Sequence, residues 1–371
     1  MAADLLQITE VLTTALLRAL GDEVDLIFRY GSFIKGNTHA YSDLDISYVP
    51  VHEATGYHIT VTVSDRLCDL YPIRWSQLES MARFENVSST VLLDYQIVYQ
   101  RSAAASERLG QLAAQLQAAL EPAARPLMIY KAQEYLQRAG YPYYLLRQQA
   151  AAGHTLACIQ QAQNIIGIVT HSLAIFNQQV VDTRKLDQIL ALPQLPDNFA
   201  SSVALITNAT APDKLLSGCD ALLDATHALL VAAQRQCPDP NVTYATVFGA
   251  GYPELKGDLQ HLLLACERRD AFSLKRVLVS LYQEVASAMT RAETGVGYGT
   301  FNSLADYEQD FVALGFPALL PAVAAGNWDK LHRQCLAFDR HLRQFLTDRG
   351  VNLYDFATVD DLRQHLAVPD Q

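Results

Sequence analysis

Residues 30–49 read YGSFIKGNTHAYSDLDISYV, and the rest of the chain is best understood from this stretch. It predicts the end of one strand, a loop that opens with Gly31 and Ser32, and a second strand that carries Asp43 and Asp45. Side chains two residues apart on an extended strand point to the same face. The second strand therefore presents two carboxylates side by side, while the apolar residues between and after them face the opposite way.

Such a carboxylate pair requires a positive charge nearby. Two adjacent negative charges repel each other and are normally compensated by a cation. Mg²⁺ suits them, because it takes hard oxygen ligands and is usually bound by one or two carboxylates together with substrate phosphates. Gly31 lets the backbone approach a phosphate closely, and Ser32 adds a hydroxyl for the β- or γ-phosphate. The stretch thus predicts a metal–nucleotide site in which Asp43 and Asp45 are the metal ligands.

A Gly-Ser pair followed by Asp-x-Asp on the next strand resembles the signature of the polymerase-beta-like nucleotidyltransferase superfamily. The text GSFIKGNTHAYSDLD is most similar to the aminoglycoside (kanamycin-type) and the minimal nucleotidyltransferases. The resemblance is close over residues 30–49 and extends loosely to residue 100. It implies a small mixed sheet with flanking helices. Members usually have a basic residue shortly after the Gly-Ser pair, and Lys35 occupies that place.

The resemblance also implies a third carboxylate from a later strand, which serves as a metal ligand or a general base. An acceptor hydroxyl that attacks phosphorus must lose its proton, and a carboxylate or a metal ion assists. Asp69 is our candidate, because it lies within a predicted strand, where a buried acid without a partner is costly. Asp65 is the alternative, although it falls in a predicted hairpin turn, where Asp is common for backbone reasons.

Periodicity predicts an α+β chain. Apolar residues at helical spacing indicate a first helix over 3–20, and alternation indicates strands, of which the last two form an antiparallel hairpin. Segment 91–99 fits a helix or a strand. The predicted strands are 24–30, 44–51, 58–63 and 67–75. The predicted later helices are 106–120, 126–139, 143–179, 213–236, 254–267, 271–291, 304–313, 316–325, 327–347 and 358–366.

From about residue 104 helical periodicity replaces alternation. We therefore expect a nucleotidyltransferase domain over residues 1–120 and a larger all-helical domain over 121–371. A further division near 237–243 is left open. Kanamycin-type enzymes use a lysine of the helical part on the triphosphate and a nearby acid as base, so the resemblance makes Lys131 and Glu134 candidates. A solvated helix face accounts for these two residues equally well.

Composition sets limits on the partners. The chain of 371 residues is 50% hydrophobic and 18% charged, which indicates a globular protein with a sizeable core. Its formal net charge of −11 disfavours a dedicated nucleic-acid binder and favours a cationic acceptor. Six cysteines without a CxxC pair indicate reduced thiols in a cytoplasmic protein. The N-terminus has no basic region typical of a signal peptide, and no unbroken apolar run suggests a membrane span.

These observations together predict a Mg²⁺-dependent nucleotidyltransferase. It would transfer a nucleoside monophosphate from a nucleoside triphosphate to an acceptor hydroxyl, with two Mg²⁺ ions held by Asp43, Asp45 and Asp69. By analogy the acceptor is an aminoglycoside-like small molecule. The alternatives are nucleotidylation of tRNA or protein, as in toxin-type members, and a non-catalytic nucleotide- or partner-binding module. The sequence determines neither the acceptor, nor the nucleotide base, nor the oligomeric state.

Overall fold

The structure is a computed structural model that divides into two compact units, Met1–Ala233 and Gln234–Gln371. Each unit is described by itself. The residues described are 5–31, 33–34, 36, 42–52, 56–85, 89–239, 241–249, 251–295 and 304–367.

The first unit contains the five-stranded sheet, in the order β3-β4-β2-β1-β5. The strands are β1 (Val24–Tyr30), β2 (Leu44–Pro50), β3 (Ile59–Val63), β4 (Arg66–Pro72) and β5 (Tyr95–Gln100). Strands β2 and β4 are parallel, and the other neighbouring pairs are antiparallel. The mixed sheet and the α+β class predicted from the sequence are confirmed. Segment 91–99, which the pattern left open, is divided between a short 3₁₀ helix over Ser89–Leu92 and β5.

A two-residue turn sets the register of the β3–β4 hairpin. Ser64 and Asp65 both have positive φ, 51° and 62°, which matches the right-handed twist of the strands they join. Strand pairing counted from this turn brings Thr60 opposite Asp69. Asp65 therefore lies in the turn, as its sequence position predicts.

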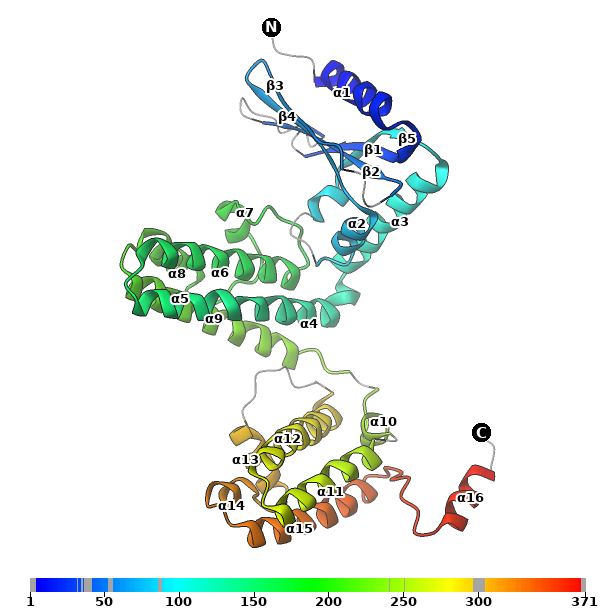
Figure 1. The fold of residues 1–371 in the computed structure, drawn as a ribbon, viewed down its shortest axis with the longest axis vertical. Helices are drawn as coiled ribbons and strands as arrows, with labels where there is room; N and C mark the ends of the chain where they lie inside the picture. The colour runs from blue at the N-terminus through cyan, green and yellow to red at the C-terminus, as the bar shows by residue number, and fades with distance from the viewer. Residues whose placement is uncertain are drawn as a thin grey trace. The chain divides into compact units, whose positions relative to one another are not determined.

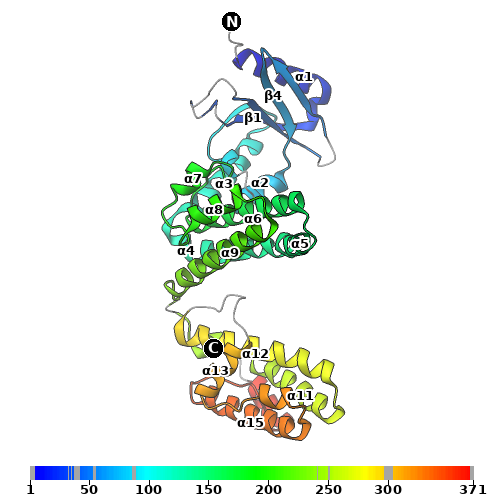
Figure 2. The ribbon, with the colours of Figure 1, turned by 90° about the vertical axis from the view of Figure 1, so that its left-hand side faces the viewer.

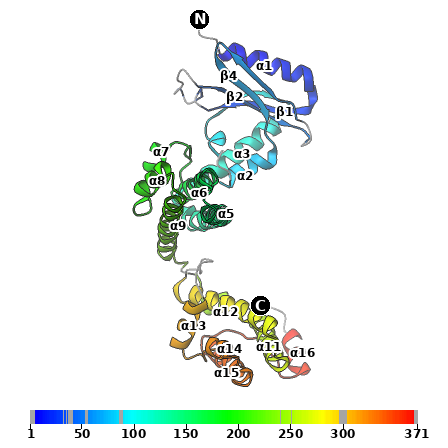
Figure 3. The same cartoon turned by 60° about the vertical axis from the view of Figure 1, so that its left-hand side comes forward.

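Helix α1 (Leu5–Leu20) covers one face of the sheet, while α2 (Trp75–Ala82) and α3 (Ala103–Leu120) lie on the other side (Figures 1 and 3). The α1 face carries a continuous apolar core. Leu44 and Ile46 of β2 belong to this core and are completely buried. Because side chains alternate along the strand, the same packing turns Asp45 to the face away from α1.

The remaining helices of the first unit form a bundle, visible in green in Figure 2. They are α4 (Arg125–Leu136), α5 (Gly140–Ala151), α6 (Thr155–Phe176), α7 (Leu186–Leu190), α8 (Phe199–Asn208) and α9 (Pro212–Arg235). The single helix predicted over 143–179 is wrong: α5 ends before Gly153, whose φ of +73° cannot continue a right-handed helix. Helix α8 was not predicted.

The second unit is helical and has its own core. Its helices are α10 (Tyr244–Phe248), α11 (Tyr252–Arg268), α12 (Ala271–Thr294), α13 (Leu304–Ala313), α14 (Leu320–Ala324), α15 (Trp328–Thr347) and α16 (Val359–Ala367). Aromatic rings fill the centre, where the ring centroids of Phe316 and Phe338 lie 4.9 Å apart and those of Phe311 and Phe338 lie 5.5 Å apart. The pairs of rings are tilted or edge-on, the arrangement that the aromatic quadrupole favours.

The boundary between the compact units lies close to the segment 237–243, where the sequence left a further division open. Helices α4 to α9 group with the sheet rather than with the second unit. The domain boundary expected at residue 120 stays a prediction.

One helix among the described residues, α9, is long and apolar enough to cross a membrane by length and composition alone. Asp220 and Asp224 interrupt it, so it contains no unbroken apolar run of that length. Its fully buried side chains, Leu215, Leu222 and Leu230 among them, recur at intervals that place them on one side of the helix. A helix in the core of a protein gives the same pattern.

Candidate active site

Asp45 is the central acid of the first unit's candidate site, and the charges of Asp43 and Asp69 act on it. In the sheet, Asp45 of β2 lies beside Tyr30 of β1 and beside Asp69 of β4. Asp43 comes two residues before Asp45, just ahead of β2, and is exposed. The parallel β2–β4 pairing thus brings together the Asp-x-Asp motif and the third acid proposed from the sequence.

The electrostatic environment of Asp45 disfavours its ionised form. Burial raises the pKa of Asp45 to about 6, and the negative charges of Asp43 and Asp69 contribute to the rise. The positive charge of Arg184 acts in the opposite direction and lowers the pKa. Asp45 is therefore a carboxylate that a bound cation would stabilise.

This raised pKa predicts how stability depends on pH in metal-free protein. The unfolded-state value is about 3.9, so the folded state binds more protons between about pH 4 and about pH 6 and loses stability as pH rises through that window. After allowance for solvent screening, we expect ionised Asp45 to lower the free energy of unfolding by about 1–2 kcal/mol above this window. Urea unfolding in EDTA at a series of pH values, with Asp45→Asn as the comparison, measures it. Parallel pH profiles for the two proteins would contradict the raised pKa.

Gly31 has a structural role against Asp45. Its φ is +86°, in the region that glycine adopts most easily. A Cβ atom at this position would lie 2.9 Å from Oδ2 of Asp45. The first glycine of the loop therefore makes room for the central carboxylate. Ser32 and Lys35, the other two loop residues predicted to bind phosphate, lie outside the described residues.

Asp69 has two side-chain partners on the edge strand side. Oδ1 of Asp69 accepts a hydrogen bond from Thr60 Oγ1 at 2.7 Å and lies 2.6 Å from Nε2 of His58. The sequence analysis did not single out His58 or Thr60. A two-residue turn at Ser64 and Asp65 would have identified both residues as neighbours of Asp69. Such a turn pairs Thr60 with Asp69, and alternation along the strand puts His58 on the same face as Thr60.

Arg184 brings a positive charge to the site from the helical part of the first unit. It lies in the segment between α6 and α7, and its side chain is 89% exposed. Its Nε and Nη2 donate to the two carboxylate oxygens of Asp182, at 2.9 and 3.1 Å. The charges of Asp43 and Asp45 help to raise the pKa of Arg184, after the larger effect of Asp182. Nothing in the local sequence indicated this residue, because it lies in a non-periodic connection.

Lys131 of α4 contacts Arg83 and Glu85. Its Nζ donates to the main-chain carbonyl of Arg83 at 2.6 Å and lies 3.9 Å from Oε1 of Glu85. Among the described residues, its contacts include none of the three aspartates. Glu134 interacts with the hydroxyl of Tyr130 and raises its pKa. The proposed triphosphate contact of Lys131 stays a prediction, and Arg184 is the cation that the structure associates with Asp43 and Asp45.

The donor set fits Mg²⁺ in its chemistry. No group of three or more His, Cys, Asp or Glu side chains within the described part of the chain is arranged as a preformed metal cage. Mg²⁺ does not require one, since it usually keeps several waters and takes one or two carboxylates plus phosphate oxygens. Asp45 and Asp69 are adjacent across the sheet, and the pKa of Asp45 is raised by its burial and by the negative charges of Asp43 and Asp69.

No protein-family model and no curated protein matches this chain. Among solved structures, the chain is similar to a nucleotidyltransferase-like protein from Exiguobacterium sibiricum 255-15, with a TM-score of 0.36 and 9% sequence identity. The similarity covers 84% of this chain and 91% of that one.

Proposed function

We propose that this protein is a Mg²⁺-dependent nucleotidyltransferase that moves a nucleoside monophosphate from a nucleoside triphosphate to an acceptor hydroxyl. The observation that supports this most strongly is the position of Asp45. Asp45 lies on β2, after the Gly-Ser loop, and its carboxylate occupies the place that a side chain at residue 31 would need. It is paired with Asp69 of the neighbouring strand β4. Burial raises its pKa, and the negative charges of Asp43 and Asp69 add to the rise.

In the proposed reaction, the acceptor oxygen forms a bond to the α-phosphorus, the bond from this phosphorus to the bridging oxygen breaks, and pyrophosphate leaves. Asp43, Asp45 and Asp69 would hold the metal, for which we propose two ions. The metal supplies Lewis-acid stabilisation of the phosphoryl oxygens. We propose that the acceptor hydroxyl passes its proton to Asp69 or to the neighbouring His58, whose Nε2 lies 2.6 Å from Oδ1 of Asp69.

For the acceptor we propose a small, positively charged, hydroxyl-bearing molecule. The net charge of −11 supports this choice, because an acidic surface concentrates cations. The same charge makes tRNA a less suitable acceptor, since nucleic-acid binders depend on basic surfaces. A cytoplasmic location remains part of this proposal.

A labelling screen tests the function. Nucleoside triphosphates labelled at the α-phosphate are incubated with Mg²⁺ and the protein, together with aminoglycosides, tRNA or cell extract in separate reactions. We expect Mg²⁺-dependent label on a small-molecule acceptor. Label on tRNA or on protein would retain the transferase assignment and overturn the acceptor. Absence of transfer with every triphosphate and acceptor, from protein shown to bind nucleotide, would favour a non-catalytic module.

Arg184 is proposed to contact the triphosphate. Its guanidinium is exposed, lies in the field of Asp43 and Asp45, and has the planar shape that suits phosphate oxygens. We expect Arg184→Met to weaken binding of a non-hydrolysable Mg²⁺–triphosphate by about tenfold, as loss of one charge-assisted contact predicts. Isothermal titration calorimetry measures this. Lys214→Met, which removes an exposed cation from α9, is the control, and equal affinity in all three proteins would remove Arg184 from the site.

A further inference from the structure

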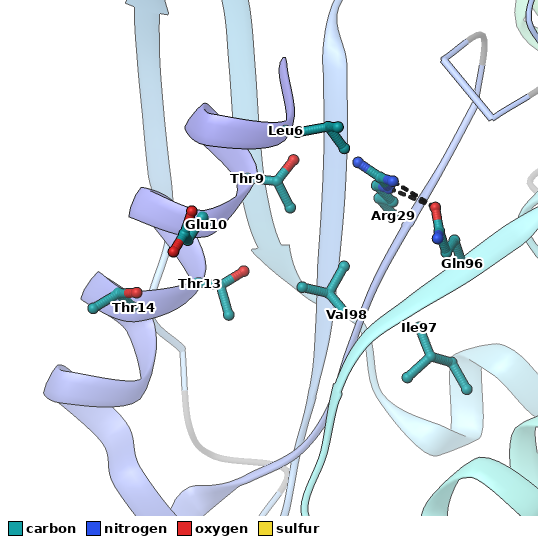
Figure 4. Close-up of a pocket in the computed structure, with 9 residues that line it drawn as sticks. All are labelled: Leu6, Thr9, Glu10, Thr13, Thr14, Arg29, Gln96, Ile97 and Val98. Carbon is teal, nitrogen blue, oxygen red and sulfur yellow. Dashed lines mark hydrogen bonds between the residues drawn. The ribbon is translucent and has the colours of Figure 1, made fainter. Parts of the chain in front are cut away.

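A cavity of about 350 Å³ lies on the opposite face of the sheet from the three aspartates, between α1 and strands β1 and β5. Figure 4 shows its lining. The residues come from α1 (Leu6, Thr9, Glu10, Thr13 and Thr14), from β1 (Arg29) and from β5 (Gln96, Ile97 and Val98). Its volume lies at the lower end of the range for small-molecule sites.

Arg29 places an incompletely satisfied cation in this cavity. The residue is 8% exposed. Gln96 Oε1 accepts hydrogen bonds from its Nε, at 3.0 Å, and from its Nη2. Its Nη1 is buried and has no hydrogen-bond partner, and Figure 4 shows this nitrogen on the side of Leu6 and α1. A buried donor left in this state costs free energy unless a ligand or water satisfies it.

Among the described residues, the charge of Arg29 has no acidic ion-pair partner. Burial lowers the pKa of its guanidinium, and no ion pair within the described residues joins it to a carboxylate. The acid in the lining, Glu10, is exposed. A buried cation without a counterion is a recognition element for an anion, since charged groups are rarely buried unless they are paired.

A second buried polar group faces the same space. Thr13 is 9% exposed, and its Oγ1 has no partner. The neighbouring Thr9 differs, because its hydroxyl donates to the carbonyl of Leu5 at 2.7 Å. One unsatisfied donor nitrogen and one unsatisfied hydroxyl in a single cavity are two independent signs of a ligand that contributes acceptor oxygens.

The apolar lining defines the rest of the ligand. Leu6 is 56% exposed and Val98 is 37% exposed, and Ile97 completes this side of the cavity. Exposed aliphatic side chains beside a buried cation suit a molecule with an apolar body and one charged end. Only one nitrogen of Arg29 is free, and Glu10 repels a second negative charge, so a monoanion fits better than a phosphate dianion.

We infer that this cavity binds a small monocarboxylate whose oxygens pair with Arg29 and Thr13 and whose apolar chain lies against Leu6, Ile97 and Val98. The site is separate from the proposed transferase site, because Asp45 faces away from α1. The two sites are close in sequence, because Arg29 comes two residues before Gly31. The guanidinium of Arg29 also contacts the loop that follows, with its Cζ 4.8 Å from the ring centroid of Phe33.

Hexanoate is the probe for the test, and hexanamide is its uncharged counterpart of similar shape. Ligand-observed NMR titration of the full chain measures the affinity of each. We expect saturable binding of hexanoate and binding of hexanamide that is weaker by about tenfold or more, as loss of one charge-assisted contact predicts. Equal affinity for the two compounds, or no binding of hexanoate, would overturn the inference.

Variants assign the binding to the cavity. Arg29→Met is expected to remove the preference for hexanoate, whereas Arg18→Met, which removes an exposed cation from α1, is expected to keep it. Because Arg29 is buried, Thr13→Val provides a second variant that preserves shape. It is expected to weaken hexanoate binding several-fold and to raise the melting temperature of the free protein, since it removes an unsatisfied hydroxyl. Unchanged hexanoate affinity in Thr13→Val, or loss of preference in Arg18→Met, would contradict the assigned contacts.

Discussion

Replacement of Asp45 by asparagine is expected to lower the rate of nucleotidyl transfer by about three orders of magnitude and to leave the fold intact. Asp45 lies between Tyr30 and Asp69 in the sheet, so its charge is central to the proposed metal site. Removal of one group that stabilises developing charge typically costs a factor of about 10²–10³, and loss of a metal ligand adds to this. Steady-state transfer assays with labelled triphosphate measure the loss.

Asp65→Asn is the matched control for this prediction. Asp65 is a carboxylate on the adjacent hairpin, but it occupies the turn with φ of 62°, a conformation that asparagine also tolerates. We expect this variant to retain full activity. Comparable activity of Asp45→Asn and the parent protein would refute the metal assignment, and a loss in Asp65→Asn alone would reverse our choice of the third carboxylate.

Substitution of Gly31 by alanine is expected to destabilise the protein by about 2 kcal/mol or more and to reduce transfer. The left-handed conformation costs a residue with a Cβ atom about 1–2 kcal/mol. The new methyl group would lie 2.9 Å from Oδ2 of Asp45, so the carboxylate or the loop must move. Denaturant unfolding measures the stability, and the transfer assay measures the displacement of Asp45.

Gly21→Ala separates the two causes. Gly21 also has positive φ, +53°, but an added Cβ would meet nothing within 4 Å. We expect this variant to lose about 1 kcal/mol from backbone strain alone and to keep its activity. If Gly31→Ala is no less stable than Gly21→Ala and equally active, the contact between Gly31 and Asp45 has no functional importance.

Local sequence determined the elements and their faces. Alternation identified β1 and β2, and the 3.6-residue period identified most of the later helices, because both patterns reflect burial of one side of a regular backbone. The same cause sets the face to which Asp43 and Asp45 point. Because Leu44 and Ile46 pack under α1, the acids that alternate with them face the other way. The hairpin was also predicted, but its register was not: the predicted strands left residues 64–66 for the turn, whereas the observed two-residue turn at Ser64 and Asp65 places Thr60 opposite Asp69.

Only the tertiary structure decided which distant residues meet. The parallel pairing of β2 with β4 joins Asp45 to Asp69, and no local pattern specifies that pairing, because β1, β2 and the β3–β4 hairpin can be ordered in more than one way. Arg184, whose positive charge acts on Asp45, lies in a connection without periodicity. The cavity beside Arg29 depends on the packing of α1 against β1 and β5. These features arise from long-range packing, in which residues far apart in the chain become neighbours for reasons that their own segments do not contain.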